Sequence, residues 1–179
     1  RSADVGLVDV QFIRGQTDLV AEPMPRHDIF MAGRPGHPLA GRAGLRLAEI
    51  LAFPMASTLI VNEVVTAAVA SGDTSDHLDA DHGELIPAIH VNSYALARQI
   101  ACDTDALVPG TARMLAPELS AGRLACLEFH MPGLRTNYAI IHRQDRSLSP
   151  AALAFIDLVR AVEAEVVATE IHVGTPAGR

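Results

Sequence analysis

The stretch "GHPLAGRAGLRLAEI", residues 36–50, places a histidine between two residues that break regular structure and continues as a short amphipathic segment. Gly36 and Pro38 interrupt helices and strands, and the residue before a proline is held in an extended conformation. Apolar residues follow at helical spacing over 45–51, which predicts a short helix. We interpret the stretch as a crossing between two lobes. Because no carboxylate or nucleophile stands at a telling spacing from His37, we expect this histidine to be structural rather than catalytic.

Short runs rich in β-branched residues lie on both sides of this crossing, and helical patterns separate several of them. The predicted strands lie at 5–10, 29–33, 55–61, 86–91, 105–110, 124–129 and 137–143, and the predicted helices between them at 94–101 and 111–119. Strands that alternate with helices indicate βαβ units. The sequence therefore predicts an α/β fold with a mostly parallel sheet.

The clearest helix is expected in "LSPAALAFIDLVRAVEAEVV", residues 148–167. Ser149 offers an N-cap oxygen, and Pro150 occupies the first helical position, where its missing N–H costs nothing. One face of this helix is apolar and is expected to cover a sheet. That face contains Ala152, Phe155, Ile156, Val159, Val162 and Val166. Residues 171–179 are expected to form a flexible tail.

The composition describes one ordinary domain or two small lobes, with 179 residues, 49% of them hydrophobic, 4% aromatic and no Trp. An aliphatic core of this kind favours layers of helix and parallel strand over an all-β sandwich. The formal net charge of −7 and the scattered arginines argue against the clustered basic surface that binds nucleic acid. No apolar run approaches the roughly 18–20 residues of a membrane span, so no contact with a membrane is expected. Cys102 and Cys126 lie far apart without a CxxC pattern, and we expect two reduced, buried thiols in a cytosolic protein.

Six segments, taken in order, resemble the effector-binding (substrate-binding) domain of LysR-type transcriptional regulators. They are "ADVGLVD", "AEPMPRHDIFMAGRPGHPLAG", "LRLAEILAFPM", "VNSYALARQIA", "ALVPGTARMLAPELSAGRLACLEF" and "AIIHRQDRSLSPAALAFIDLVR". The resemblance runs from Ala3 to about Val166, and "HPLA" together with "SPAALAFIDLVR" is a specific pair. It implies a periplasmic-binding-protein-like fold of type 2, in which two Rossmann-like lobes are joined by two crossover strands. On this pattern lobe I comprises 1–53 and 131–170, and lobe II comprises 54–130.

The resemblance implies that the chain senses a ligand and is not an enzyme. A small-molecule effector, by default a carboxylate or an aromatic acid, would bind in the cleft between the lobes and shift the populations of two lobe arrangements. The change would pass through a homodimer or homotetramer to a winged helix-turn-helix module. Only that absent N-terminal module would contact DNA, with RNA polymerase as a further partner. No cofactor and no metal are expected, and the implied location is the cytoplasm.

The chain departs from the family pattern in two places. The DNA-binding module, its linker helix, and the first strand and helix of lobe I all precede "ADVGLVD" in the family, so lobe I is expected to be incomplete here. The segment "CDTDALVP", residues 102–109, replaces the usual glycine-containing turn, and Asp103 and Asp105 tolerate the same turn geometry. If these two carboxylates face the cleft, they would repel an anionic ligand.

Ligands of open α/β sheets bind beyond the carboxyl ends of strands, where helix N-termini present free N–H groups. Three such places nominate pairs of effector-binding residues, namely Gln11 and Phe12, Ser57 and Thr58, and Asn92 and Ser93. The middle pair could instead be plain strand residues, and the last pair a plain helix cap that contributes about 1 kcal/mol. The basic residues that we consider for the cleft are Arg14, Arg98 and Arg135.

Other chemistries and function classes have weaker support in the sequence. The segment "DTSDHLDADHGE", residues 73–84, is dense in Asp, His and Glu but has no EF-hand glycine or HxxxH spacing, so we interpret it as a solvated acidic surface. Asp103 beside Cys102 would raise the pKa of that thiol, which argues against a redox sensor.

The alternative function is a free-standing bilobal solute-binding protein of a transporter, which would require a secretion leader. An enzyme of the same bilobal fold would need a cofactor-bearing cysteine in a basic cleft.

Overall fold

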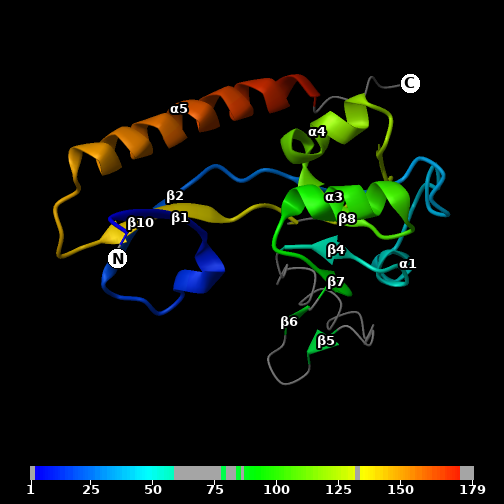
Figure 1. The fold of residues 1–179 in the computed structure, drawn as a ribbon, viewed down its shortest axis with the longest axis horizontal. Helices are drawn as coiled ribbons and strands as arrows, with labels where there is room; N and C mark the ends of the chain where they lie inside the picture. The colour runs from blue at the N-terminus through cyan, green and yellow to red at the C-terminus, as the bar shows by residue number, and fades with distance from the viewer. Residues whose placement is uncertain (1–2, 59–77, 80–83, 86, 132–133, 174–179) are drawn as a thin grey trace. The chain divides into compact units, whose positions relative to one another are not determined.

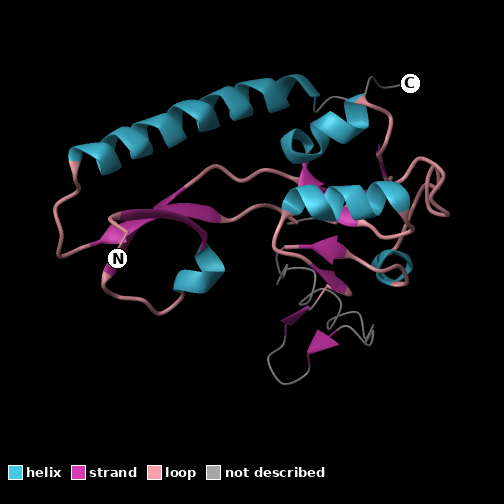
Figure 2. Cartoon of the chain, viewed as in Figure 1, coloured by secondary structure: helices cyan, strands magenta, loops and turns pink. Residues whose placement is uncertain are grey.

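The computed structural model describes residues 3–58, 78–79, 84–85, 87–131 and 134–173. The chain divides into two compact units, the first made of Arg1–His27 with Arg135–Arg179 and the second of Asp28–Leu134. The chain therefore passes twice between the units, as two lobes joined by two crossovers require. Each unit combines helices with strands (Figures 1 and 2).

The first unit is built on a three-stranded sheet of order β1–β10–β2, in which both pairings are antiparallel. Its elements are β1 (Val5–Asp9), the 3₁₀-helix η1 (Val10–Ile13), β2 (Leu19–Pro23), β10 (Tyr138–Arg143) and α5 (Pro150–Val173). The register places Ile140 of β10 opposite Leu7 on one side and Glu22 on the other. Strand β2 was not predicted, because it is an edge strand that is mostly exposed and ends on Pro23, so it lacks the apolar pattern of a buried strand.

Helix α5 begins where the sequence predicts. The Ser149 hydroxyl oxygen accepts a hydrogen bond from the backbone N–H of Ala152 at 3.2 Å. Ala152 and Ile156 are buried, but the prediction for Phe155 and Val162 is wrong, because these side chains are 41% and 51% exposed. Successive residues turn by about 100° around a helix. Phe155 and Val162 therefore lie at the margin of the stripe through the two buried residues.

The second unit contains the remaining strands and helices. They are β3 (Ile29–Gly33), α1 (Leu47–Leu51), β4 (Ala56–Ser57), β5 (Leu78–Asp79), β6 (Glu84–Leu85), β7 (Ile89–His90), α3 (Tyr94–Asp103), β8 (Val108–Thr111), α4 (Ala112–Ser120) and β9 (Ala125–Cys126). Strands β4 and β7 are parallel, and a parallel bridge joins Met55, the residue before β4, to Leu107, the residue before β8. Strand β3 lies between β8 and β9 and is antiparallel to both, and β5 and β6 form a separate antiparallel pair.

Most pairings between the described strands are antiparallel, so the prediction of a mostly parallel sheet is wrong. Strands β3 and β10 are each the first strand after the chain enters its unit. Each then lies in the middle of a three-stranded sheet and runs opposite to both neighbours. Because β3 already belongs to the second unit, the chain passes between the units near residue 27. The segment 36–50 lies inside the second unit. The lobe bounds 1–53 with 131–170 and 54–130 stay a prediction.

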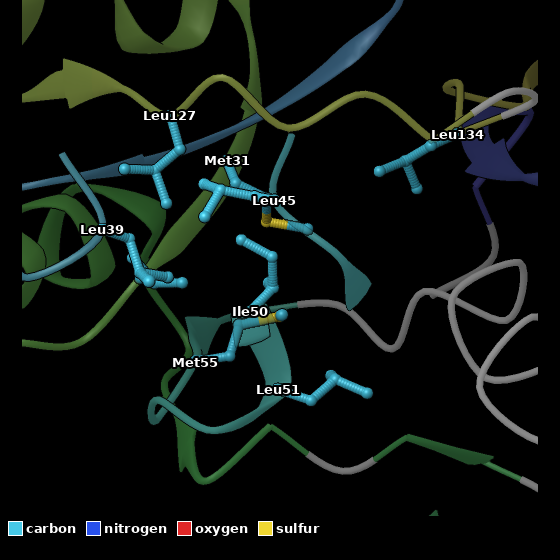
Figure 3. Close-up of a cluster of buried hydrophobic side chains, with 9 residues drawn as sticks. Met31, Leu39, Leu45, Ile50, Leu51, Met55, Leu127 and Leu134 are labelled. Carbon is cyan, nitrogen blue, oxygen red and sulfur yellow. The ribbon is translucent and has the colours of Figure 1, made fainter. Parts of the chain in front are cut away.

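The core of the second unit consists of two clusters of buried aliphatic side chains. The larger cluster is formed by Met31, Leu39, Leu45, Ile50, Leu51, Met55, Leu107, Leu127 and Leu134. The side chains that Figure 3 labels come from β3, from α1 and from loops of the same unit. The other cluster is formed by Ala32, Ala56, Ala97, Ala101, Ala106, Val108, Leu115 and Leu124. Its many alanines let α3 lie close to the strands.

His37 is part of this packing, since its side chain is only 3% exposed. Its Nδ1 accepts a hydrogen bond from the backbone N–H of Leu39 at 3.1 Å, and its Nε2 lies 3.2 Å from the carbonyl oxygen of Asp105. Because Nδ1 is an acceptor, Nε2 carries the proton and donates a hydrogen bond to that carbonyl oxygen. The ring also lies 4.5 Å from the ring of Phe53. Both nitrogens are thus used by the backbone, and the structural role expected for His37 is confirmed.

Candidate functional site

The carboxyl ends of β4 and β7 meet at one edge of the second unit. Ser57 pairs with His90 in the parallel ladder, and the N–H of Val91 donates to the carbonyl oxygen of Ser57 at 3.1 Å. Thr58 comes directly after β4, and Asn92 follows β7 after Val91, so parallel pairing brings them to the same edge. Among the residues nominated here, Ser57 is buried, Thr58 is partly exposed, and Asn92 and Ser93 are exposed. The structure thus brings together the four nominated residues of this unit.

Helix α3 starts at this edge without a side-chain cap. Ser93 stands at the N-cap in extended backbone, but its side chain makes no capping hydrogen bond. In α4 the hydroxyl oxygen of Thr111 accepts from the N–H of Met114 at 3.3 Å. Ser93 therefore occupies the N-cap position that one of the two alternatives gave it but makes no side-chain capping bond, and the positive end of the α3 dipole faces Asn92 and Ser93 without that screening. This is the geometry that binds anionic groups at helix N-termini.

Tyr94 fixes the first turn of α3, and the sequence analysis did not nominate it. Its hydroxyl donates to the carbonyl oxygen of Pro109 in β8 at 2.9 Å. Gly110 permits this contact, because a Cβ atom at that position would lie 1.9 Å from the Tyr94 oxygen. A glycine inside a strand often marks such a close approach, so the Pro109–Gly110 pair was the available signal.

Arg98, one of the basic residues considered for the cleft, is engaged elsewhere. Its guanidinium donates to the carbonyl oxygen of Met114 and to a carboxylate oxygen of Glu118, both at 2.8 Å. The buried Glu118 also pairs with Arg123 at 3.1 Å, and Arg98 lies over the ring of Tyr94 at 5.5 Å. The guanidinium of Arg98 is therefore held by Met114 and Glu118, and Glu118 shares its single negative charge between Arg98 and Arg123.

Gln11 and Phe12 belong to the first unit. They lie in η1, directly after β1, and Phe12 is 62% exposed. The N–H of Val10 donates to the carbonyl oxygen of Asn137 at 2.8 Å, which anchors the start of η1. Gln11 and Phe12 follow a strand, as the sequence predicts. That they share a binding site with Asn92 and Ser93 stays a prediction.

The first unit also contains a cavity that the sequence analysis did not predict. Its volume is about 540 Å³, and it is lined by Glu22, Pro23, Met24, Pro25, Ile140, Arg160, Glu163, Ala164, Val167 and Ala168. Among these, Arg160 makes two hydrogen bonds to the carboxylate of Glu22, at 2.9 and 2.6 Å. The hydrogen bond from Arg160 lowers the pKa of Glu22 below its ordinary value. The cavity is mostly apolar, with this ion pair among its lining residues.

The two cysteines do not have the properties of a redox pair. Both are free, and Cys102 is partly buried whereas Cys126 is exposed. The expectation of two buried thiols is wrong for Cys126, which lies in the two-residue strand β9. Desolvation by the surrounding protein atoms raises the pKa of both thiols, and at Cys102 the charges of Glu118 and Asp103 add to this effect while those of Arg123 and Arg98 oppose it. A raised pKa reduces the thiolate fraction, which makes a thiol less reactive.

The acidic segment 73–84 lies largely outside the described residues. The described part forms the β5–β6 pair, in which Leu78 pairs with Leu85 and Asp79 pairs with Glu84. Within the described residues, no group of three or more His, Cys, Asp or Glu side chains is placed to hold a metal ion. None of the described helices is both long and apolar enough to cross a membrane.

The family model described as the LysR substrate binding domain matches residues 1–164 of the chain. This chain belongs to the LysR substrate-binding domain family. The resemblance carried by "HPLA" and "SPAALAFIDLVR" is therefore confirmed, and with it the periplasmic-binding-protein-like α/β fold. The two compact units are consistent with the bilobal architecture of that fold.

A similar curated protein is the SDS degradation transcriptional activation protein of Pseudomonas sp. (strain ATCC 19151). The two are 32% identical over 158 residues, which cover 86% of this chain and 48% of the relative. The LysR domain described here thus spans about half the length of that relative.

Solved structures of LysR regulatory domains share the fold. The regulatory domain of MetR from N. meningitidis matches with a TM-score of 0.65 at 13% identity, covering 89% of this chain and 72% of that one. The regulatory domain of CcmR from Synechocystis PCC6803, solved in complex with 2-PG, matches with a TM-score of 0.61 at 17% identity, covering 90% and 74%. At these identities the similarity concerns the fold alone.

Proposed function

We propose that this LysR substrate-binding domain senses a small-molecule effector on behalf of a transcriptional regulator and catalyses no reaction. The observation that carries the proposal is the uncapped N-terminus of α3 beside Asn92 and Ser93, at the carboxyl edge of β4 and β7. The relative from Pseudomonas is named as a transcriptional activation protein, and the CcmR regulatory domain was solved with a small ligand. Both names support sensing over the alternative of solute transport.

The site favours an effector that carries a carboxylate or another anionic group. Such a group would accept hydrogen bonds from the first turn of α3, from the Asn92 amide and from the Ser93 hydroxyl. Thr58 would add a hydroxyl from the neighbouring strand, and Ser57 would hold the edge in place from its buried position. Gln11 and Phe12 would contribute from the other unit. An effector that contacts both units favours one arrangement of the lobes and thereby shifts their populations.

In this proposal the rest of the regulator responds to the shift in the populations of the two lobe arrangements. The domain assembles as a homodimer or homotetramer in the cytoplasm, and a winged helix-turn-helix module elsewhere in the full-length protein contacts DNA. The acidic composition of the chain, with a formal net charge of −7, supports assigning the DNA contact to another part of the regulator. A contact with RNA polymerase would follow from activation of transcription.

A thermal-shift screen tests the binding step directly. The panel contains small carboxylates, aromatic acids and a short-chain alkyl sulfate, the last because the Pseudomonas relative is named for SDS degradation. A ligand that binds only the folded state raises the melting temperature, with about 2.7 kcal/mol of stabilisation at one hundred times its Kd. We expect at least one carboxylate or sulfate to produce such a shift.

Matched variants separate binding from helix capping. Ser93→Ala should change the unliganded stability by less than about 0.5 kcal/mol, because Ser93 makes no capping bond, yet it should reduce the ligand-induced shift. Thr111→Ala should cost about 1 kcal/mol, because Thr111 does cap its helix, and should leave the ligand-induced shift unchanged. Ser120→Ala, at an exposed position, serves as the neutral control. If Ser93→Ala, Asn92→Ala and Gln11→Ala all preserve the shift, the site assignment is wrong.

A further inference from the structure

A buried histidine of the first unit is joined to the middle of α5. His27 is 9% exposed, and its Nε2 forms a hydrogen bond with Oε1 of Glu163. The side chain of Glu163 is itself only 17% exposed. An ionised carboxylate only accepts hydrogen bonds, so Nε2 carries the proton and donates the hydrogen bond to Oε1 of Glu163. The two residues are 136 positions apart in the chain.

His27 also takes part in the pairing of the two crossover segments. It is the last residue of the first unit before the chain leaves, and Thr136 is the second residue after the chain returns. The N–H of His27 donates to the hydroxyl oxygen of Thr136 at 2.9 Å, and the N–H of Thr136 donates to the carbonyl oxygen of His27 at 2.9 Å. Thr136 is buried as well. The outgoing and returning segments are therefore bound to each other, and the His27 side chain extends that connection to α5.

We propose that the His27–Glu163 contact is a conformational latch, which ties α5 to both crossover segments. The proposal rests on the proposed function in one respect, namely the expectation that an effector-driven change in the lobes alters the geometry of these segments. A hydrogen bond from His27 to a 24-residue helix resists that change, and its loss frees the segments to move. The next charged residue toward the start of α5, Arg160, binds Glu22 and Asp157 instead. Of these two charged residues of α5, it is therefore Glu163 that forms the latch with His27.

Amide hydrogen exchange of the unliganded chain tests the latch. The N–H of Thr136 reports the crossover pair, the α5 amides near Glu163 report the helix, and the N–H of Leu107, bonded to Pro54 in the second unit, is the reference. We expect His27→Ala and Glu163→Ala each to accelerate exchange by roughly tenfold at both Thr136 and α5, with no change at Leu107. The double variant should show no more than the larger single effect, because both substitutions remove one contact.

Conservative variants keep the test decisive if the alanine variants unfold the first unit. His27→Gln and Glu163→Gln retain a donor and an acceptor and should keep most of the protection. Glu163→Asp shortens the side chain while keeping its charge, and it should accelerate Thr136 exchange because the contact is lost. Glu165→Ala, at an exposed position of α5, is the matched control and should change neither reporter. Unchanged Thr136 exchange in Glu163→Ala and Glu163→Asp would overturn the latch. This measurement uses no effector, so its failure is distinct from a failure of the thermal-shift screen.

Discussion

Different interactions stabilise the interior of each of the two units. In the second unit, aliphatic side chains of two clusters are almost completely removed from solvent. Figure 3 shows how side chains of the larger cluster lie. In the first unit, the buried aliphatic side chains among the described residues are Ala139, Ile140, Ala152 and Ile156. Helix α5 of that unit keeps Leu153, Phe155, Leu158 and Val162 exposed. Polar contacts of α5 to the rest of the unit include Arg160 with Glu22 and Glu163 with His27. The comparison teaches that the second unit is stabilised by its own core, whereas the placement of α5 depends on hydrogen-bonded pairs.

The largest expected effect is a difference between two isoleucine truncations. Ile50→Ala in the second unit should lower the free energy of unfolding by about 4 kcal/mol, because it opens a cavity in a fully packed cluster. Ile156→Ala in α5 should cost only about 2 kcal/mol, since fewer buried side chains surround it. Urea denaturation monitored by circular dichroism measures both. Equal losses would remove the distinction between the units.

The next largest effect on stability is expected where the backbone of Gly110 approaches the Tyr94 side chain in the second unit. Gly110→Ala should destabilise the chain by about 3 kcal/mol, because the new methyl group meets the Tyr94 hydroxyl and also Leu115. Adding Tyr94→Phe should recover part of this loss by removing the clashing oxygen. Gly36→Ala is the matched control, because its nearest atom is the far end of the flexible Arg34 side chain. A Gly110→Ala variant as stable as Gly36→Ala would contradict the packing described here.

An acid titration addresses the ion pair at the cavity of the first unit. The pKa of Glu22 is lowered in the folded chain, chiefly by the hydrogen bond from Arg160. A lowered pKa means that the pair stabilises the fold above the ordinary pKa of glutamate and loses this contribution as the pH falls through the folded value. NMR titration should give Glu22 a pKa below that of a free glutamate, and Arg160→Gln should raise it again. A normal Glu22 pKa in the unmodified chain would show that α5 does not use this contact in solution.

The smallest effect concerns the two thiols. Because the pKa values of Cys102 and Cys126 are raised, alkylation by iodoacetamide should be slower at neutral pH than for a free cysteine. The alkylation rates of both thiols should rise with pH through a range above the ordinary thiol pKa. Mass spectrometry of tryptic peptides follows each site separately. Fast alkylation of either thiol at pH 7 would reopen the redox hypothesis.

Local patterns in the sequence were sufficient for the helices and for several strands. The Ser149–Pro150 pair predicted the start of α5, and the run at 29–33 matches β3. Strand direction could not be predicted in this way, because the partners of β3 and β10 are far away in the chain. The exposed sequence of β2 carried no signal, and the boundary between the units near residue 27 depends on which sheet β3 joins.

The candidate site could be predicted only in part. The succession of strand, polar pair and helix was enough to nominate Asn92 and Ser93. Whether Ser93 caps its helix depends on the orientation of one hydroxyl, which no residue pattern specifies. The contact from Tyr94 to Pro109 and the pair His27–Glu163 depend on tertiary structure, so they required coordinates.

The most direct test of effector sensing is a map of amide chemical-shift changes, recorded by NMR with a compound that raises the melting temperature of the chain. We predict that the largest changes fall on residues 92–96, at the start of α3, with further changes at Gln11 and Phe12. Changes confined to the residues around the cavity of the first unit, or a panel in which no compound binds, would contradict effector sensing at this site.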